Sequence, residues 1–230
     1  MPEVVLFAGP SAYGIDRALI DGGGIDLRPP VRRGDIDRLL AAGGAAGGAA
    51  GVLIVCDGVF HVEPAVSHAE LCRALDAGWQ VWGVSSIGAI RAHELRAQGM
   101  RGFGYVHAMF ERFEDFTDDE MCLLHFPEPP FFPVSVALVD LRHALEQRGR
   151  EFGIADAAGQ ALIEALRGLW FGDRTEQRIA GLMRAQGGID ERSAALLLDG
   201  LRQHRVKAMD LARLLACRPW RDRDDRAGTP

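Results

Sequence analysis

Lysine is almost absent from this chain. Of its 26 basic residues, 25 are arginine and one, Lys207, is lysine. Together with the many alanines and glycines, this indicates a GC-rich coding bias that replaces lysine by arginine wherever the two are interchangeable. Because a desolvated lysine can serve as a base and arginine cannot, Lys207 is a candidate for chemistry. The alternative interpretation is chance survival on a helix surface.

Other scarce features exclude whole classes of protein. The cysteines are few, widely spaced and without a CxxC pair, which is typical of buried thiols in a reducing cytoplasm rather than of disulfides or zinc ligands. No apolar run approaches the length of a membrane span, and the N-terminus lacks the basic region of an export signal. The net charge of −6 argues against binding to nucleic acid. We therefore expect a cytoplasmic protein with no membrane or nucleic-acid partner. The cysteines are Cys56, Cys72, Cys122 and Cys217.

Short apolar runs alternate with helical patterns in the first part of the chain. Strands are predicted over 4–8, 25–28, 52–56 and 80–83. Helices are predicted from Asp35 to Leu40, over 65–77 with Pro64 in the first turn, and over 87–98. This alternation predicts an α/β fold, with a mainly parallel sheet flanked by helices.

The remainder of the chain is helical in pattern. Helices are predicted over 134–149, 154–168, 174–186, 191–204 and 208–215. We therefore expect an α/β core over residues 1–133, an α-helical C-terminal region over 134–220 packed on that core, and a disordered tail over 221–230.

The segment 80–95 has the layout of a strand, a sharp turn and a helix, with Ser85 and Ser86 at the turn. It resembles the nucleophile elbow of α/β hydrolases, in which a helix N-terminus stabilises negative charge on the reacting atom. With Ser85 as nucleophile, the small residue two positions later is replaced by Ile87. With Ser86 as nucleophile, the residue two positions earlier is Val84. The pattern alone leaves both serines as candidates.

Further candidate binding residues lie near the predicted strand ends. Asp57 follows a strand and points toward the usual ligand edge of an α/β sheet. Ser11 follows another strand, where it fits either an anion site or a tight turn. The group Arg32, Arg33 and Asp35 fits either a partner's carboxylate end or a helix cap with a salt bridge.

Three other polar groups have ordinary structural explanations beside the functional ones. Arg91 could bind substrate or pair with Glu94 three residues later. His125 is more often a packed histidine than a catalyst. The acidic run Asp118-Asp119-Glu120 could hold a metal, but consecutive acids before a helix are more often an N-terminal cap. We expect no metal and no cofactor.

A series of short segments follows in one order between residue 4 and about residue 145. It comprises Gly9-Pro10-Ser11, 30–35, 57–60, 64–70, 83–95, 99–104, and Asp118-Asp119-Glu120 with His125. In this order the segments resemble the TfuA-like proteins.

The resemblance implies a partner of YcaO enzymes, which use ATP to activate a peptide backbone amide and, with TfuA, replace its oxygen by sulfur. A TfuA-like protein is expected to hydrolyse the C-terminal thiocarboxylate of a small ThiS-like sulfur carrier and so release sulfide. The expected context is a ribosomally synthesised peptide, with the precursor peptide engaged indirectly. The alternative is a non-catalytic adaptor that docks the carrier and peptide to YcaO. A generic esterase is disfavoured because no clear Asp or Glu and then His follows the serine.

The resemblance also assigns roles to residues. The serine of the family's Ser-Met-Gly-Ala-Leu-Arg turn matches Ser86, which makes Ser86 the expected nucleophile and leaves Ser85 to shape the turn. The family's His-Lys-Glu reads His68-Ala69-Glu70 here, so that lysine is missing. A late helix of the family carries another lysine, and Lys207 falls in the matching segment. Lys207 is therefore the expected base, with His68 as the fallback.

Overall fold

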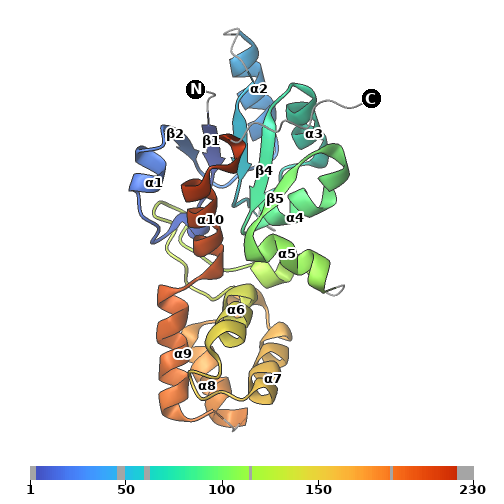
Figure 1. Cartoon of the computed structure of the whole chain (residues 1–230). Helices are drawn as coiled ribbons and strands as arrows, with labels where there is room; N and C mark the ends of the chain where they lie inside the picture. The colour runs from blue at the N-terminus through green and yellow to red at the C-terminus, as the bar shows by residue number, and fades with distance from the viewer. Residues whose placement is uncertain (1–3, 46–49, 60–62, 114–115, 187–188, 222–230) are drawn as a thin grey trace.

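The computed structural model describes residues 4–45, 50–59, 63–113, 116–186 and 189–221. It has a sheet-containing part, formed mainly by the N-terminal half of the chain, and a separate group of helices below it (Figure 1). The predicted fold class, a parallel sheet flanked by helices followed by a helical region, is confirmed. Residues 222–230 of the predicted tail lie outside the described residues.

Five parallel strands form the sheet in the order β2-β1-β3-β4-β5. Four of them lie where apolar runs predict strands. The fifth, β5, was not predicted, because its three residues Arg-Gly-Phe form a short and partly exposed edge strand without an apolar run. The strands are β1 (Val4–Phe7), β2 (Ile25–Arg28), β3 (Val52–Val55), β4 (Gln80–Val84) and β5 (Arg101–Phe103).

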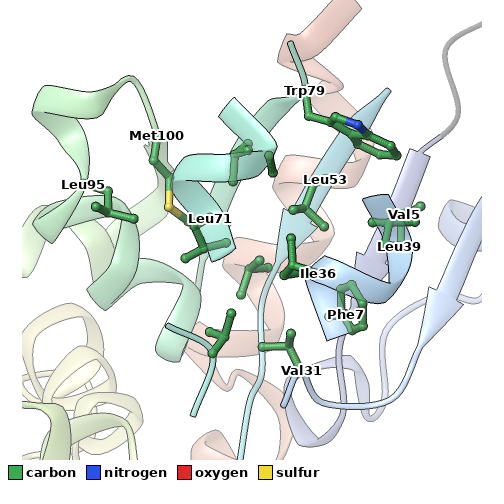
Figure 2. Close-up of a cluster of buried hydrophobic side chains, with 14 of the residues drawn as sticks. Val5, Phe7, Val31, Ile36, Leu39, Leu53, Leu71, Trp79, Leu95 and Met100 are labelled. Atoms are coloured by element: carbon green, nitrogen blue, oxygen red, sulfur yellow. The ribbon is translucent and has the colours of Figure 1, made fainter. Parts of the chain in front are cut away.

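Alternate residues of the strands point to opposite faces of the sheet. On one face, Val5, Phe7 and Leu53 are buried against the helices that connect the strands (Figure 2). These helices are α2 (Asp35–Ala45), α3 (His68–Asp76) and α4 (Ile87–Glu94).

Helices from the two ends of the chain cover the other face. There Leu6 and Ile54 pack against Leu211 and Leu214 of the last helix. The covering helices are α1 (Ala18–Asp21) and α10 (Val206–Cys217). Because α10 follows the helical group in sequence, the chain leaves the sheet, builds that group, and returns to close the sheet (Figure 1).

Several helix boundaries differ from the sequence-based expectation, among them those of α3 and α2. Helix α3 begins at His68 and not at Ala65, because Ser67 and Glu70 form a reciprocal capping box that fixes the first turn there. Helix α2 continues past Leu40 into the Ala/Gly segment and is described as far as Ala45.

The helical group has its own apolar core, which includes Leu141, Leu162, Met183 and Leu197. Its helices are α6 (Leu138–Arg148), α7 (Asp156–Arg167), α8 (Glu176–Gln186) and α9 (Glu191–Gln203). Helix α5 (Gly104–Arg112) and the short 3-10 helix η3 (Asp118–Met121) lie between this group and β5 in sequence.

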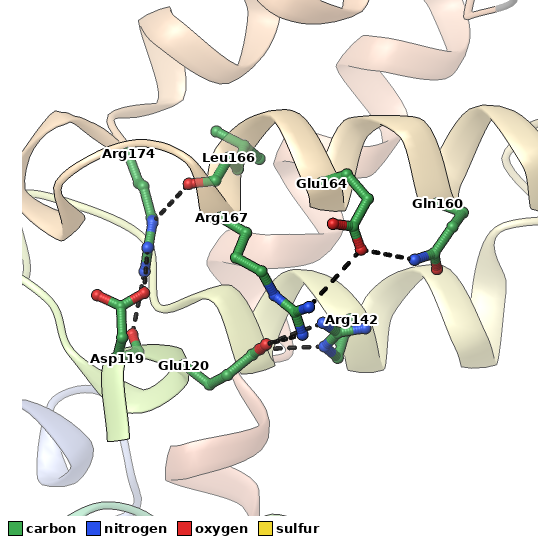
Figure 3. Close-up of polar contacts among 8 residues, drawn as sticks. All are labelled: Asp119, Glu120, Arg142, Gln160, Glu164, Leu166, Arg167 and Arg174. Carbon is green, nitrogen blue, oxygen red and sulfur yellow. Dashed lines mark hydrogen bonds and ion pairs between the residues drawn. The ribbon is translucent and has the colours of Figure 1, made fainter. Parts of the chain in front are cut away.

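Buried ion pairs join η3 to the helical group (Figure 3). The carboxylate of Glu120, 1% exposed, accepts hydrogen bonds from Arg142 at 3.0 and 2.8 Å and from Arg167 at 3.1 Å. Arg174, also 1% exposed, donates to the side chain and carbonyl of Asp119. The acidic run at 118–120 therefore anchors η3 to arginines of the helical group.

Within the described residues, no helix combines the length and apolar character that crossing a membrane requires.

Candidate functional site

Three loops meet at the carboxyl edge of the sheet, where β1, β3 and β4 end. The chain passes from β1 outward to β2 and then back across to β3, so the strand order reverses between β1 and β3. In open α/β sheets, ligands bind beside such a reversal, outside the carboxyl ends of the strands. The three loops carry Ser11, Asp57 and the pair Ser85 and Ser86, which places four of the predicted site residues at this edge.

The turn from β4 to α4 is unusually tight. Ser85 has a φ of +65°, a conformation that costs a non-glycine residue about 1–3 kcal/mol. The backbone N–H of Ser86 donates to Val84 O at 2.7 Å and closes the turn. Gly83 and Gly88 allow the helix to lie directly on the sheet, since an ideal Cβ on Gly88 would stand 1.8 Å from Val55 O. The sequence thus builds a strained strand-to-helix turn at the sheet edge.

The two serine side chains have different surroundings. Ser85 is completely buried, and its Oγ donates to the carbonyl of Lys207 at 2.7 Å. Ser86 is 3% exposed and occupies the N-cap of α4, where its Oγ makes no capping hydrogen bond. The N–H of the next residue, Ile87, finds no acceptor among the described residues. An uncommitted hydroxyl therefore lies beside an uncommitted helix N–H.

Lys207 lies close to this turn although it is more than 120 residues away in sequence. It is buried, and its carbonyl accepts from Ser85. Its backbone N–H donates to Asp140 Oδ1 at 3.1 Å, and its Nζ donates to Met121 O at 2.8 Å. Lys207 therefore connects the serine turn, helix α6 and η3, and it is not a surface lysine.

Cys56 is a further member of this cluster. Burial, followed by the neighbouring Asp57 carboxylate, raises the pKa of the Cys56 thiol well above its ordinary value, against the opposing effect of Ser85, Lys207 and Ser11. A thiol that stays protonated is a poor nucleophile. Cys56 therefore packs the floor of the site and is not suited to attack a carbonyl.

Asp57 connects the loop after β3 to the loop after β1 through hydrogen bonds. Its carboxylate accepts from Gly9 N at 2.8 Å, from Ser11 N at 2.9 Å and from Ser11 Oγ at 2.7 Å. These three bonds keep the carboxylate engaged within the protein. Asp57 and Ser11 thus fix the shape of the edge.

The group Arg32, Arg33 and Asp35 lies in the loop that leads into α2. Asp35 accepts from the N–H of Arg32 at 2.7 Å, while the Arg32 side chain pairs with Glu63 at 3.1 Å on the surface. The N–H of Arg33 donates to Pro64 O at 3.1 Å. In this structure Arg32 and Asp35 therefore form a local cap and surface pairs.

His68, on α3, and Arg91, on α4, both contact Glu94 at the end of α4. The imidazole Nε2 of His68 lies 2.8 Å from Glu94 Oε2, and Arg91 binds the same oxygen at 2.6 Å and the carbonyl of Val66 at 3.2 Å. Glu94 comes eight residues after Ser86, which is about 12 Å of helical rise. The structure thus joins His68 to Arg91 and Glu94, whereas it joins Lys207 to the serine turn.

In the described part of the chain, no group of three or more His, Cys, Asp or Glu side chains is arranged to hold a metal ion.

The predicted candidate His125 packs locally. Its Nδ1 lies 2.7 Å from Phe126 O, and its ring stands edge-on to the ring of Phe131.

Asp140 and Arg205 were missed by the sequence analysis. Asp140 supports the backbone of Lys207, and Arg205 donates from Nη1 to Pro10 O at 3.1 Å and from Nη2 to Tyr13 O. Both hold α10 in place at the carboxyl edge. The only signal for Arg205 is its position two residues before the lone lysine, and Asp140 carries none.

Comparison with known proteins gives a family match. The model of the TfuA-like protein family matches residues 57–175, just over half of the 230-residue chain. No curated protein matches the chain. The matched segment contains Asp57, the serine turn and η3, and ends within the helical group. The expectation from the ordered motifs is confirmed, and the chain belongs to the TfuA-like protein family.

Proposed function

We propose that this protein hydrolyses the thiocarboxylate of a ThiS-like sulfur carrier and supplies sulfide to a YcaO enzyme that thioamidates a ribosomally synthesised peptide. The observation that carries the proposal is the β4–α4 turn. There, among the described residues, neither the Ser86 hydroxyl nor the Ile87 N–H has a hydrogen-bond partner, and Lys207 is buried nearby. The family membership supports the choice of substrate.

The chemistry requires a nucleophile, an oxyanion donor and a proton acceptor. Ser86 attacks the carbonyl carbon of the thiocarboxylate, and the Ile87 N–H at the start of α4 donates to the developing oxyanion. One such donor is worth about 3 kcal/mol in well-studied hydrolases. Sulfide leaves, and water then releases the acyl group from the serine. Ser85 is the less suitable nucleophile because its hydroxyl is buried and donates to a carbonyl.

Lys207 is the proposed base, ahead of His68. Its backbone carbonyl accepts from Ser85, in the same turn as Ser86, and its Nζ has a single hydrogen-bond acceptor, Met121 O, among the described residues. The imidazole of His68 is half exposed and is held by Glu94 further along α4. We therefore assign proton transfer to Lys207.

The test is sulfide release from a thiocarboxylated carrier. Ser86→Ala should lower the rate by about a thousandfold or more while the variant keeps its fold and binds the carrier. Lys207→Arg should also be inactive, because arginine keeps the positive charge but does not give up its proton. His68→Ala, the control, should stay within a few-fold of the wild type. Unchanged release by Ser86→Ala would remove Ser86 as the nucleophile.

The second candidate function is a non-catalytic adaptor that docks the carrier and peptide to YcaO. The 3% exposure of Ser86 favours it, as does Ala69 in place of a family lysine. An adaptor predicts that Ser86→Ala supports thioamidation by YcaO as well as the wild type does.

A further inference from the structure

A cavity of about 750 Å³ lies at the junction of the sheet-containing part and the helical group. We call it the junction cavity. Its lining comes from the loop after β1, the segment between η3 and α6, helices α6, α8 and α9, and Arg205 just before α10. Ser86, Ile87 and Lys207 do not line it, so it is distinct from the proposed hydrolytic centre. Its volume is within the range of ligand pockets, about 300–1,000 Å³.

Aromatic and aliphatic side chains form one wall of the junction cavity. The rings of Tyr13 and Phe132 meet edge to face with centroids 5.2 Å apart. Phe126 is 59% exposed, Phe132 47% and Val134 42%. Clustered large apolar side chains left in water are typical of binding surfaces.

The charges of the junction cavity leave one acceptor and one donor free. Arg202 and Glu176 neutralise each other in a salt bridge of 2.6 Å. Asp140 is 2% exposed and uses Oδ1 to accept from Lys207 N, while its Oδ2 has no partner among the described residues. Arg205 forms no salt bridge within the described residues, and it uses two of its N–H groups on backbone carbonyls. A guanidinium has five such groups, so others remain.

This arrangement matches a peptide bond better than it matches a charged group. A ligand carboxylate bound to Arg205 would also face the Asp140 carboxylate, and a ligand ammonium bound to Asp140 would also face the Arg205 guanidinium. A backbone amide can donate its N–H to Asp140 and offer its carbonyl to Arg205, with neighbouring side chains on the aromatic wall. We propose that the junction cavity binds an uncharged, apolar peptide segment in an extended conformation.

The test is fluorescence polarisation with labelled, capped octapeptides on the full chain. The first probe contains Phe, Leu, Val and Gly, and two matched probes carry a central Asp or a central Lys. The apolar probe should bind, and each charged probe should bind at least about tenfold more weakly, a difference of about 1.4 kcal/mol. Ser86→Ala should bind the apolar probe like the wild type, so failure of the hydrolytic proposal and failure of this one are separable.

Variants locate the binding. Asp140→Asn can keep an oxygen on the Lys207 N–H while it presents an NH₂ group to the ligand's N–H, and it should weaken binding about tenfold. Phe132→Ala, at a half-exposed ring, should weaken it several-fold without affecting the fold. Leu196→Ala removes an equally exposed apolar side chain of α9 outside the cavity and should change nothing. Absence of binding by the apolar probe, equal binding of the charged probes, or unchanged binding by Phe132→Ala would overturn the proposal.

Discussion

Asp210 connects the last helix to the sheet edge through a single side chain. Its carboxylate accepts from the N–H groups of Tyr105 at 3.0 Å and Val106 at 2.9 Å, and so it caps α5 from α10. The backbone approaches the carboxylate closely at Gly104, whose φ is +92° and where any Cβ would lie 2.3 Å from the carboxyl carbon. Burial raises the pKa of Asp210 to about 6, against the opposing effect of the two N–H donors.

This raised pKa predicts a pH dependence of the free energy of unfolding. The unfolded chain loses the Asp210 proton near pH 4, whereas the folded chain holds it until about pH 6. The stabilisation is therefore fully present below pH 4 and is lost as the pH rises through 6, by about 3 kcal/mol in total. Urea unfolding of wild type and Asp210→Asn between pH 4 and 7 measures it as the difference between the two profiles. Parallel profiles would contradict the prediction.

Helix α4 is the element on which the candidate site depends. The strand and turn that precede it could be predicted, because an apolar run ends at glycine and two serines. The close packing of the helix on the sheet could not be predicted, because it depends on which backbone atoms of β3 lie against Gly88. The start of α3 was placed wrongly because Pro64 is a common first-turn residue, while the capping box of Ser67 and Glu70 fixes the start more strongly.

Gly88→Ala tests the packing of α4. Its Cβ would stand 1.8 Å from Val55 O, so helix and strand must move apart, and we expect a loss of at least about 3 kcal/mol in the free energy of unfolding. Gly181→Ala in α8 is the matched control. No atom lies within 4 Å of its added Cβ, and alanine there should stabilise the protein by about 0.5–1 kcal/mol. Chemical denaturation of both variants measures the contrast.

At the scale of the whole molecule, buried charges hold the two parts together. Glu120 is shared by Arg142 and Arg167, which belong to α6 and α7. Sequence analysis could suggest a cap for the run at 118–120 but not these partners, because the arginines are 22 and 47 residues away. The partners of Lys207 could not be predicted for the same reason, because they depend on how the chain returns from the helical group to the sheet.

Glu120→Gln should destabilise the protein more than removal of the charge from an ordinary surface pair does. Removing the charge of the buried carboxylate weakens its bonds to Arg142 and Arg167, and we expect a loss of about 3 kcal/mol in the free energy of unfolding. Glu164→Gln is the control, since Glu164 is 53% exposed and lies 3.9 Å from the same Arg167. Its effect should stay below about 0.5 kcal/mol. Equal effects in thermal or urea unfolding would argue against a structural role for the buried pair.

Helix α10 is synthesised long after the strands that it covers. On a ribosome, β1 and β3 emerge more than 150 residues before the helix that shields one of their faces. Until then the apolar side chains of that face remain open to water and to other nascent chains. Folding of the sheet is therefore completed only after α10 has emerged, whereas the helical group, built from neighbouring segments, can form earlier.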